Sequence, residues 1–340
     1  MTWQNQSPPA DHPAVRSGGI GVLLVNLGTP DEASPAAVKR YLAEFLSDPR
    51  VIEIPKLAWQ VILRGIILNV RPKKSAEAYA KVWTERGSPL AAITQDQATG
   101  LQDRLGRQVR VEYAMRYGNP SIPDQLSAMK DAGCERILLA PLYPQYCAAT
   151  TATVVDKAGE TLRNVRWQPS LRTLPPYHDD RLYIDALAAD LGAQLDALPF
   201  EPEVLLLSFH GMPERTLHLG DPYHCHCRKT ARLLSDRLQR EGMRIETTFQ
   251  SRFGRAKWLE PATDEVLMAE GAGGTKRLAV AAPGFAADCV ETLEELAIAG
   301  REQFTEAGGE EYAVLSCLNA GEPGMDMLEA MVRRELAGWI

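Results

Sequence analysis

The residue with the clearest chemical potential is His210, which lies in the segment LLLSFHGMPERTLHLGDPYHCHCRKT, residues 205–230. The histidine directly follows an apolar run, and Cys225 and Cys227 lie further along the same segment. An imidazole titrates near pH 6.5, so at neutral pH it can accept a proton or bind a metal ion. These residues alone leave three interpretations open: a metal site, a catalytic base, or a strand end with polar neighbours.

A second group of reactive side chains follows Pro283, where Asp288, Glu291 and Glu295 are spaced three and four residues apart. If an α-helix begins at Asp288, the three carboxylates share one face of it. Like charges at this spacing cost roughly a few tenths of a kcal/mol. An ordinary solvated acidic face, favoured by the dipole at the helix N-terminus, is therefore one interpretation. The alternative is a site that collects a cation or shares protons.

The elements that must position these side chains alternate between strand and helix. Ser34 and Pro35 fit the N-cap and the first position of a helix that follows the first strand. Continuous apolar strands separated by helices predict an α/β fold whose parallel sheets are covered on both faces. The strand patterns are GVLLVNLGTP (21–30), RVEYAMRYG (110–118), ERILLAPLYPQY (135–146), EVLLLSFHGMP (203–213) and KRLAVAAPGF (276–285).

Two pairs of these units resemble each other. LLVNLGTP is similar to LLLSFHGMP, and RILLAPLYPQYCAATTATV is similar to RLAVAAPGFAADCVETLEE. We therefore predict two similar Rossmann-like lobes, 19–168 and 169–310, of which the second carries His210 and Glu291. Residues 1–18 are expected to form a flexible tail, and 311–340 a C-terminal segment that packs back on the first lobe.

The carboxyl ends of the strands are the expected place of the site, because ligands of open parallel sheets bind there. His210 ends one strand, and the helix with the three carboxylates begins at the end of another. Both are therefore expected to face one cleft between the lobes. These patterns predict a protein able to handle a metal cation and leave its substrate open.

Composition excludes several classes of function. The 340 residues carry a net charge of −7 that is spread along the chain, so nucleic acid is not an expected partner. The N-terminal residues lack the apolar core of a signal peptide, and the six cysteines are scattered. Reduced thiols and a cytoplasmic location are expected from these features.

The most apolar segment is LAWQVILRGIILNV, Leu57–Val70, which is interrupted by Arg64. It is shorter than the roughly 20 apolar residues that a transmembrane helix needs. The first interpretation is an ordinary helix that faces the core. An apolar lip over a pocket and a contact with a membrane surface are the alternatives.

The two cysteines of the 205–230 segment are not expected to bind one ion. The segment PYHCHCRKTARLLSDRL is predicted to be a helix with Asp221 as its N-cap. Residues two apart on a helix point about 200° away from each other, so Cys225 and Cys227 face different sides. His224 and His226 are expected to be partly exposed residues of this helix.

Several segments resemble the ferrochelatase family, in the order that the family has them. They are LLVNLGTPDE, RGSPL, AMRYGNPSI, PLYPQY, LLLSFHGMPERTLHLGDPY, TFQSRFGRAKWLEPATDEVL and PGFAADCVETLEEL. The resemblance extends over nearly the whole chain from Gly19. It implies a chelatase-like fold and an enzyme that inserts ferrous iron into protoporphyrin IX to form protohaem, the last step of haem biosynthesis.

The resemblance also implies roles for individual residues. His210 and Glu291 would be the catalytic residues and the iron ligands, and Asp288 and Glu295 would continue a path for protons or metal. Arg116 would pair with a propionate of the porphyrin. The positions that match the porphyrin pocket are Leu27, Gly28, Thr29, Pro30, Arg116, Tyr117, Tyr143 and Tyr146.

The sequence departs from the family pattern in several places. No cysteine follows Cys317, and Cys147 lies one residue before the cluster-binding position of some relatives, where Ala148 stands. We therefore expect no [2Fe-2S] cluster and no tightly bound cofactor, with Fe²⁺ and porphyrin as substrates. Cys289 occupies a position where many relatives have histidine. Leu27 stands where relatives that prefer coproporphyrin carry tyrosine, which favours protoporphyrin.

Other functions remain open beside this one. They are a coproporphyrin III ferrochelatase and a non-catalytic tetrapyrrole-binding protein on the same fold. A nucleotide-binding protein is disfavoured because NLGTPDE lacks the G-x-G-x-x-G pattern. The resemblance also suggests transient contact with the inner membrane surface through Leu57–Val70 and hand-over with neighbouring enzymes of the haem pathway.

Overall fold

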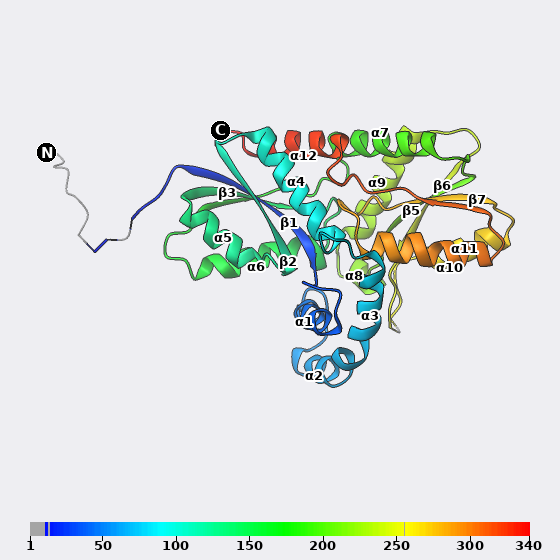
Figure 1. Ribbon diagram of the computed structural model, residues 1–340, viewed down its shortest axis with the longest axis horizontal. Coiled ribbons are helices and arrows are strands. Elements are labelled where there is room, and N and C mark those ends of the chain that lie inside the picture. The colour runs from blue at the N-terminus through cyan, green and yellow to red at the C-terminus, as the bar shows by residue number, and fades with distance from the viewer. Residues whose placement is uncertain (1–10, 13, 255) are drawn as a thin grey trace.

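The strands of the computed structural model form two parallel sheets, around which the helices are arranged (Figure 1). The structure describes residues 11, 12, 14–254 and 256–340. Of the predicted flexible tail, residues 1–10 and 13 therefore lie outside the described residues.

The two sheets have the same topology. The first has the order β2-β1-β3-β4 and the second the order β6-β5-β7-β8, with every neighbouring pair parallel. The segments that resemble each other in sequence, at β1 and β5 and at β3 and β7, thus occupy equivalent places. This confirms the prediction of two similar Rossmann-like lobes. The strands are β1 (Gly19–Thr29), β2 (Val109–Gly118), β3 (Cys134–Pro141), β4 (Ser170–Thr173), β5 (Val204–His210), β6 (Arg244–Gln250), β7 (Arg277–Ala281) and β8 (Glu311–Val314).

Two short edge strands shift the boundaries between the predicted parts. β4 pairs with β3 of the first sheet, and β8 pairs with β7 of the second. The predicted boundaries at 168 and 310 each fall just before a strand that belongs to the preceding sheet. Each of these strands has only four residues, which is too short for a clear alternation of apolar and polar positions.

Helices separate the strands in both lobes (Figure 1). The helix α1 begins as predicted, because the Ser34 hydroxyl accepts a hydrogen bond from the Ala37 amide and Pro35 occupies the first turn. In the first part of the chain lie α1 (Pro35–Phe45), α2 (Lys56–Ile62), the π-helix η1 (Leu63–Ile67), α3 (Leu68–Val82), α4 (Pro89–Leu105), α5 (Ile122–Asp131), the π-helix η2 (Ala148–Ala152) and α6 (Thr153–Arg163). In the second part lie α7 (Arg181–Ala197), α8 (Glu214–His218), α9 (Tyr223–Leu238), α10 (Thr263–Ala272), the π-helix η3 (Glu291–Gly300), α11 (Arg301–Glu306) and α12 (Glu322–Glu335).

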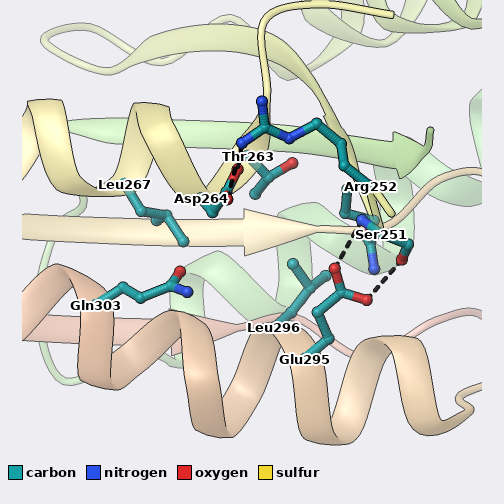
Figure 2. Close-up of a pocket in the computed structure, with 9 residues that line it drawn as sticks. Ser251, Arg252, Thr263, Asp264, Leu267, Glu295, Leu296 and Gln303 are labelled. Atoms are coloured by element: carbon teal, nitrogen blue, oxygen red, sulfur yellow. Dashed lines mark hydrogen bonds and ion pairs between the residues drawn. The ribbon is translucent and has the colours of Figure 1, made fainter. Parts of the chain in front are cut away.

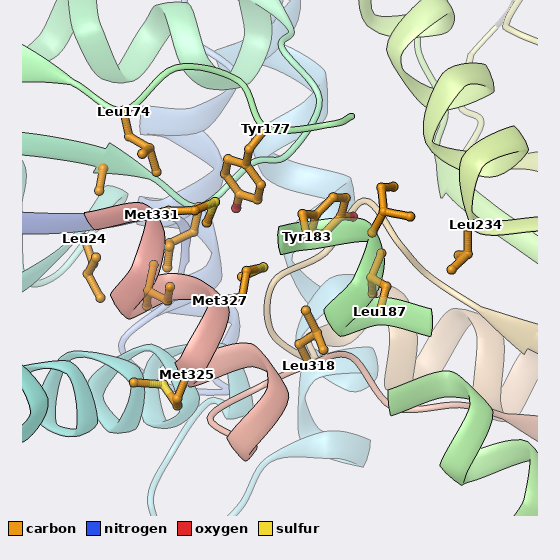
Figure 3. Packing of buried hydrophobic residues seen from close by; sticks show 14 of the residues in the cluster. Leu24, Leu174, Tyr177, Tyr183, Leu187, Leu234, Leu318, Met325, Met327 and Met331 are labelled. Atoms are coloured by element: carbon orange, nitrogen blue, oxygen red, sulfur yellow. The ribbon is translucent and has the colours of Figure 1, made fainter. Parts of the chain in front are cut away.

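One apolar core joins the two lobes. It extends from Leu24 in the first sheet, past Met331 of α12 and Leu187 of α7, to Leu234 of α9 (Figure 3). A separate cluster fills the space between the first sheet and α5 and α6. Because the shared core is continuous across α7 and α12, the carboxyl ends of both sheets are held in a fixed arrangement.

The C-terminal helix α12 lies against both lobes. Arg104 of α4 forms ion pairs with Glu322 at 2.8 Å and Asp326 at 2.5 Å, which tie α12 to the first lobe. On another side of α12, Met327 packs in the core together with Leu187 of α7 (Figure 3). The segment therefore packs on the first lobe and also on α7.

The apolar segment Leu57–Val70 faces the core on one side only. Leu63 and Leu68 are buried in a core cluster, whereas the exposed fraction is 87 % at Leu57 and 74 % at Val61. The interpretation as an ordinary core-facing helix therefore accounts for one side of the segment and leaves the other apolar side unexplained. Within the described part of the chain, none of the helices combines the length and the apolar character that crossing a bilayer requires.

Candidate active site

A pocket opens where strands of both sheets end. Its walls come from the ends of β1 and β5, from the segments after β3 and β7, and from the start of η3. The free space is about 610 Å³, open solvent included. The pocket is lined by Asn26, Leu27, Leu90, Leu142, Tyr143, Gln145, Thr150, His210, Tyr223, Gly284, Phe285, Ala286, Ala287, Cys289 and Glu291.

His210 is the last residue of β5 and presents its ring to this pocket. Its Nδ1 lies 2.7 Å from the carbonyl oxygen of Gly211. A carbonyl oxygen can only accept, so Nδ1 carries a proton, and in the neutral imidazole Nε2 is the acceptor. The Tyr223 hydroxyl donates to the His210 carbonyl oxygen at 2.9 Å. His210 is therefore prepared to accept a proton or bind a cation through Nε2.

Glu291 begins the π-helix η3 and also lines the pocket. The sequence predicted an α-helix from Asp288, but the regular helix from Glu291 has i→i+5 hydrogen bonds, and Asp288 precedes it. The three carboxylates consequently do not share one helix face. The same run of residues is compatible with an α-helix and with a π-helix, so the apolar pattern in the sequence did not distinguish the two kinds of helix.

Asp288 is buried and does not line the pocket. Its Oδ2 accepts a hydrogen bond from the Asn319 side chain at 2.7 Å, and its Oδ1 accepts from the Thr292 hydroxyl at 2.9 Å. The amide of Cys317 also donates to Oδ1, at 3.3 Å. The carboxylate thus holds the segment after β8 against the start of η3, and its place on a path for protons or metal stays a prediction.

Glu295 lines a second, polar cavity (Figure 2). Its carboxylate accepts two hydrogen bonds from Ser251, one from the amide at 2.7 Å and one from the hydroxyl at 2.5 Å. Burial raises the pKa of Glu295, although the Ser251 hydrogen bonds and the electrostatic influence of His210 act in the opposite direction. Arg252, which also lines this cavity, is paired with Asp264. Glu291 and Glu295 therefore face two different cavities, four residues apart on one helix.

Comparison with known proteins decides the family. The family model described as Ferrochelatase matches residues 19–336. The ferrochelatase of Rhizobium meliloti (strain 1021) is 53% identical over 97% of this chain and 98% of its own length. That of Rhizobium johnstonii is 52% identical over 100% of both chains. The chain belongs to the ferrochelatase family. Its function is accordingly that of a metal chelatase in haem biosynthesis.

Solved structures support the fold assignment. SirB from Bacillus subtilis with Fe³⁺ matches with a TM-score of 0.57 and 14% identity, covering 94% of this chain and 96% of that one. CbiX, the terminal enzyme for biosynthesis of siroheme in denitrifying bacteria, matches with a TM-score of 0.50 and 14% identity, over 94% of this chain and 100% of its own. This member of the ferrochelatase family thus has a chelatase-like fold of two lobes, as the sequence predicted.

Of the predicted porphyrin-binding residues, Leu27 and Tyr143 line the pocket of this ferrochelatase family member. Burial raises the pKa of Tyr143 well above its ordinary value, so its hydroxyl stays protonated. Among the described residues that hydroxyl has no hydrogen-bond partner, although it is buried. A buried hydroxyl without a partner is costly, and a ligand in the pocket is one means of satisfying it.

The other residues of the first loop do not line the pocket, and neither does Tyr146. Gly28 has φ +116°, and a Cβ atom there would lie 1.8 Å from the Tyr117 carbonyl oxygen, so this glycine permits the close approach of β1 and β2. The Thr29 hydroxyl donates to Ser88 at 2.9 Å, and Pro30 is buried beside it. The Tyr146 amide donates to His226 Nδ1 at 3.1 Å.

Arg116 and Tyr117 are not among the residues that line the pocket. Arg116 forms an ion pair with Asp48 and donates from Nε to the Thr153 hydroxyl at 2.7 Å. The Tyr117 hydroxyl donates to Asp48 at 2.8 Å. Burial alone would raise the pKa of Asp48, but hydrogen bonds from Thr153, the Arg50 amide and Tyr117, together with the charge of Arg116, lower it. Arg116 therefore neutralises a buried carboxylate, and its pairing with a propionate stays a prediction.

The cysteines lie in unlike environments. Cys225 is exposed and Cys227 is buried, in agreement with their spacing on α9. Burial raises the pKa of Cys147 and of Cys289 well above the ordinary value, so both are neutral thiols at physiological pH. Among residues 11–12, 14–254 and 256–340, no group of three or more His, Cys, Asp or Glu side chains is arranged to hold a metal ion.

Sequence reasoning missed several residues of this site. Asn26, Gln145 and Tyr223 line the pocket, and Gln250 and Ser251 contact η3. All five lie at or shortly after strand ends or at the start of a helix. Ligands bind at the carboxyl ends of parallel strands. If this rule is applied to TFQS at the end of β6 as well as to β5, it identifies Gln250 and Ser251.

Proposed function

We propose that this member of the ferrochelatase family inserts Fe²⁺ into protoporphyrin IX to form protohaem, with His210 and Glu291 as its catalytic residues and iron ligands. The observation that carries the proposal is that a histidine, whose Nδ1 is hydrogen-bonded to a carbonyl oxygen, and a carboxylate line one largely apolar pocket. The two groups come from the end of β5 and from the start of η3, so the fold brings them to the same pocket from different segments.

The chemistry of metal insertion requires both groups. A porphyrin must lose two pyrrole N–H protons when a divalent ion enters the ring. His210 Nε2 and the Glu291 carboxylate accept these protons, and each can bind the ion transiently. Two protein ligands suffice, because a closed site with four ligands would retain the iron instead of releasing it to the ring.

The protons leave through Glu295 in this proposal. Glu295 is four residues beyond Glu291 on η3 and lies on the second cavity, which is lined by polar side chains such as Gln303. Its raised pKa makes the carboxyl group able to take up a proton near neutrality more readily than an exposed glutamate. Asp288 lines neither cavity, so the proposed path runs through Glu295.

Protoporphyrin is the favoured substrate because Leu27 gives the pocket an apolar wall. A hydroxyl at this position would suit a porphyrin with more carboxyl groups. Tyr143 provides a second wall and its hydroxyl a donor to the bound porphyrin. Coproporphyrin III insertion is the alternative activity, and a carrier without chemistry is the alternative function. Neither a [2Fe-2S] cluster nor another tightly bound cofactor forms part of the proposal.

The apolar segment 57–70 suggests where the enzyme receives its substrate. Leu57, Val61, Ile66 and Val70 expose 87, 74, 59 and 68 % of their surface. Side chains of this kind gain free energy when they leave water, about 25 cal/mol per Å² of apolar surface. We therefore propose a cytoplasmic enzyme that rests transiently on the inner membrane surface, where an apolar porphyrin is available and where enzymes of the same pathway exchange it.

An anaerobic absorbance assay tests the proposal. Protoporphyrin or coproporphyrin is mixed with protein and Fe²⁺ or Zn²⁺, and the metalloporphyrin spectrum is followed. General-base catalysis contributes about 10²–10⁴-fold, so His210→Ala is expected to lower turnover by at least that factor, and Glu291→Gln to lower it strongly. His218→Ala, at an exposed position of α8, is the matched control and is expected to stay active.

The outcomes separate the alternatives. Faster turnover with coproporphyrin than with protoporphyrin would exclude the proposed substrate. Binding of porphyrin without insertion in any combination would favour a carrier. Normal turnover by the His210→Ala protein would remove this residue from the mechanism.

A further inference from the structure

We propose that Gln250, the last residue of β6, is a positioning residue that fixes Glu291 relative to His210. The inference rests on the proposed roles of His210 and Glu291. It adds a third residue, which need not touch the substrate.

Gln250 is bonded to the segments of both catalytic residues. Its Nε2 donates to the Glu291 carbonyl oxygen at 2.9 Å. Its own carbonyl oxygen accepts from the Gly211 amide at 2.7 Å, and its backbone is the register partner of His210. One buried residue, only 3 % exposed, therefore spans the distance between the histidine turn and the start of η3.

The side-chain amide is itself held in one orientation. The Ser208 hydroxyl donates to Gln250 Oε1 at 2.7 Å, and Ser208 lies two residues before His210 on β5. Ser208 also contacts the Thr263 hydroxyl at 2.9 Å. With Oε1 fixed as the acceptor, the amide nitrogen is directed at Glu291. Only a side chain that has a donor and an acceptor on one planar group performs both tasks.

The hydrogen bond from Gln250 is made to the backbone of Glu291, whose orientation sets the direction of the Glu291 side chain. Glu291 is the first residue of the π-helix, and the orientation of its peptide group sets the direction of its Cα–Cβ bond. The next residue, Ser251, binds the Glu295 carboxylate with its amide and hydroxyl. Two consecutive residues at the end of β6 thus hold Glu291 and Glu295 of η3. A displacement of about 1 Å of a catalytic group can cost 10²-fold in rate.

A substitution without a donor tests the role. Gln250→Met keeps the length and the burial of the side chain and removes both hydrogen bonds of the amide. We expect kcat for Zn²⁺ or Fe²⁺ insertion to fall by about 10- to 100-fold. The protoporphyrin KM is expected to change less than twofold, because Gln250 does not line the porphyrin pocket.

Gln102→Met is the matched control. The Gln102 side chain also makes hydrogen bonds at both ends of its amide, to the Gly106 and Val109 carbonyl oxygens and from the Val111 amide. These contacts join α4 to β2 and do not reach the pocket. Its replacement is expected to lower stability in urea unfolding without lowering kcat. A fall of kcat in both variants alike would attribute the effect to stability and overturn the proposal.

A double-mutant cycle tests whether Gln250 acts through Glu291. In the Glu291→Gln background, Gln250→Met is expected to lower kcat by no more than about twofold, because the group that it positions has already lost its chemistry. Full additivity of the two losses would overturn the proposal. The single Glu291→Gln variant serves as a separate test: if it turns over normally, the proposed role of Glu291 fails, whatever Gln250 does.

Ser208→Ala keeps the test decisive if Gln250→Met does not fold. This small truncation removes the donor that orients Oε1 and leaves the Gln250 amide in place. It is expected to lower kcat by about three- to tenfold with an unchanged protoporphyrin KM, a smaller effect than loss of the amide. An unchanged kcat in this variant would overturn the proposal.

Discussion

Replacement of Arg116 distinguishes a structural residue from a porphyrin-binding one. In the structure its side chain is 10 % exposed and that of its partner Asp48 is 6 % exposed. Breaking a buried ion pair by removing one partner costs about 3–5 kcal/mol, because the remaining charge stays buried without its counterion. Asp48 keeps its hydrogen bonds from Thr153 and Tyr117 in an Arg116→Leu protein, so we expect the lower end of that range, about 3 kcal/mol.

The assay combines urea unfolding with porphyrin titration. In a thermal melt, a loss of about 3 kcal/mol corresponds to a fall in melting temperature of roughly 4 °C for a protein of this size, because the entropy of unfolding is about 2.1 cal/mol/K per residue. Protoporphyrin affinity, measured by quenching of tryptophan fluorescence, is expected to stay within twofold. Arg181→Ala is the control, since Arg181 forms an exposed ion pair with Asp185, and such pairs contribute about 0–1 kcal/mol.

One result would refute the reasoning. If Arg116→Leu leaves the free energy of unfolding unchanged and raises the KM for protoporphyrin tenfold or more, Arg116 pairs with a propionate in solution. The ion pair with Asp48 would then belong to a state that opens when porphyrin binds. A combined Asp48→Asn and Arg116→Leu protein is expected to lose less stability than the sum of the two single variants, because the two side chains interact directly.

Four further outcomes are expected. Burial and the stacked His226 ring lower the pKa of His178 to about 4, so the unfolded chain binds a proton at this residue more readily than the folded protein does. The contribution of His178 to the free energy of unfolding is therefore fully present above about pH 6.5 and is lost as the pH falls toward 4, by up to roughly 3 kcal/mol. Urea unfolding at pH 7.5 and 5 is expected to show this loss in the natural protein and much less of it in His178→Phe. Val61→Asp is expected to weaken sedimentation with lipid vesicles and leave turnover of a detergent-dispersed porphyrin unchanged; equal sedimentation would contradict the membrane contact. Glu295→Gln is expected to lower turnover less than Glu291→Gln, and the reverse order would contradict the proposed proton path. The purified protein is expected to contain no stoichiometric acid-labile sulfide, and a sulfide content that tracks activity would show a cluster.

The lobes could be predicted from the sequence because a buried parallel strand is recognised from its own consecutive residues. Runs such as LLLSFH in β5 are apolar throughout and end in turn residues, and their repetition along the chain revealed the two similar units. His210 could be placed for the same reason, since the carboxyl end of a strand is a local feature. The edge strand β4 has four partly exposed residues and gives no such signal.

The environment of Arg116 could not be predicted, because it depends on residues far away in the chain. Its partner Asp48 is 68 positions earlier and Thr153 is 37 positions later. Neither segment carries a pattern that marks it as a neighbour of β2. An arginine near a strand end is compatible with a ligand contact and with a buried ion pair, and only the packing of α1 and α6 against β2 decides between them.

The segment 57–70 was predicted only in part, for a different reason. Its apolar residues suggested burial, and a helix with a third or more of its residues apolar usually has a core-facing stripe. Here Leu63 and Leu68 form that stripe, while Leu57 and Val61 remain exposed on the other sides. Apolar residues on all sides of a helix are buried only if other parts of the protein pack against every side. In this fold, other elements pack against one side only.

The acidic residues of η3 show why the site needs more than its catalytic side chains. Their spacing is compatible with an α-helix and with a π-helix, and the two forms direct Glu291 and Glu295 differently. The structure holds this helix from outside, through the Gln250 amide on the Glu291 carbonyl oxygen and through Ser251 on the Glu295 carboxylate. Ser251 adopts φ +65° to do so, a left-handed conformation that costs a serine energy. Such strain persists only where its surroundings enforce it, and here it accompanies the hydrogen bonds that hold the Glu295 carboxylate at the second cavity. The geometry of the acidic pair is therefore set by the end of β6, which has no acidic residue of its own.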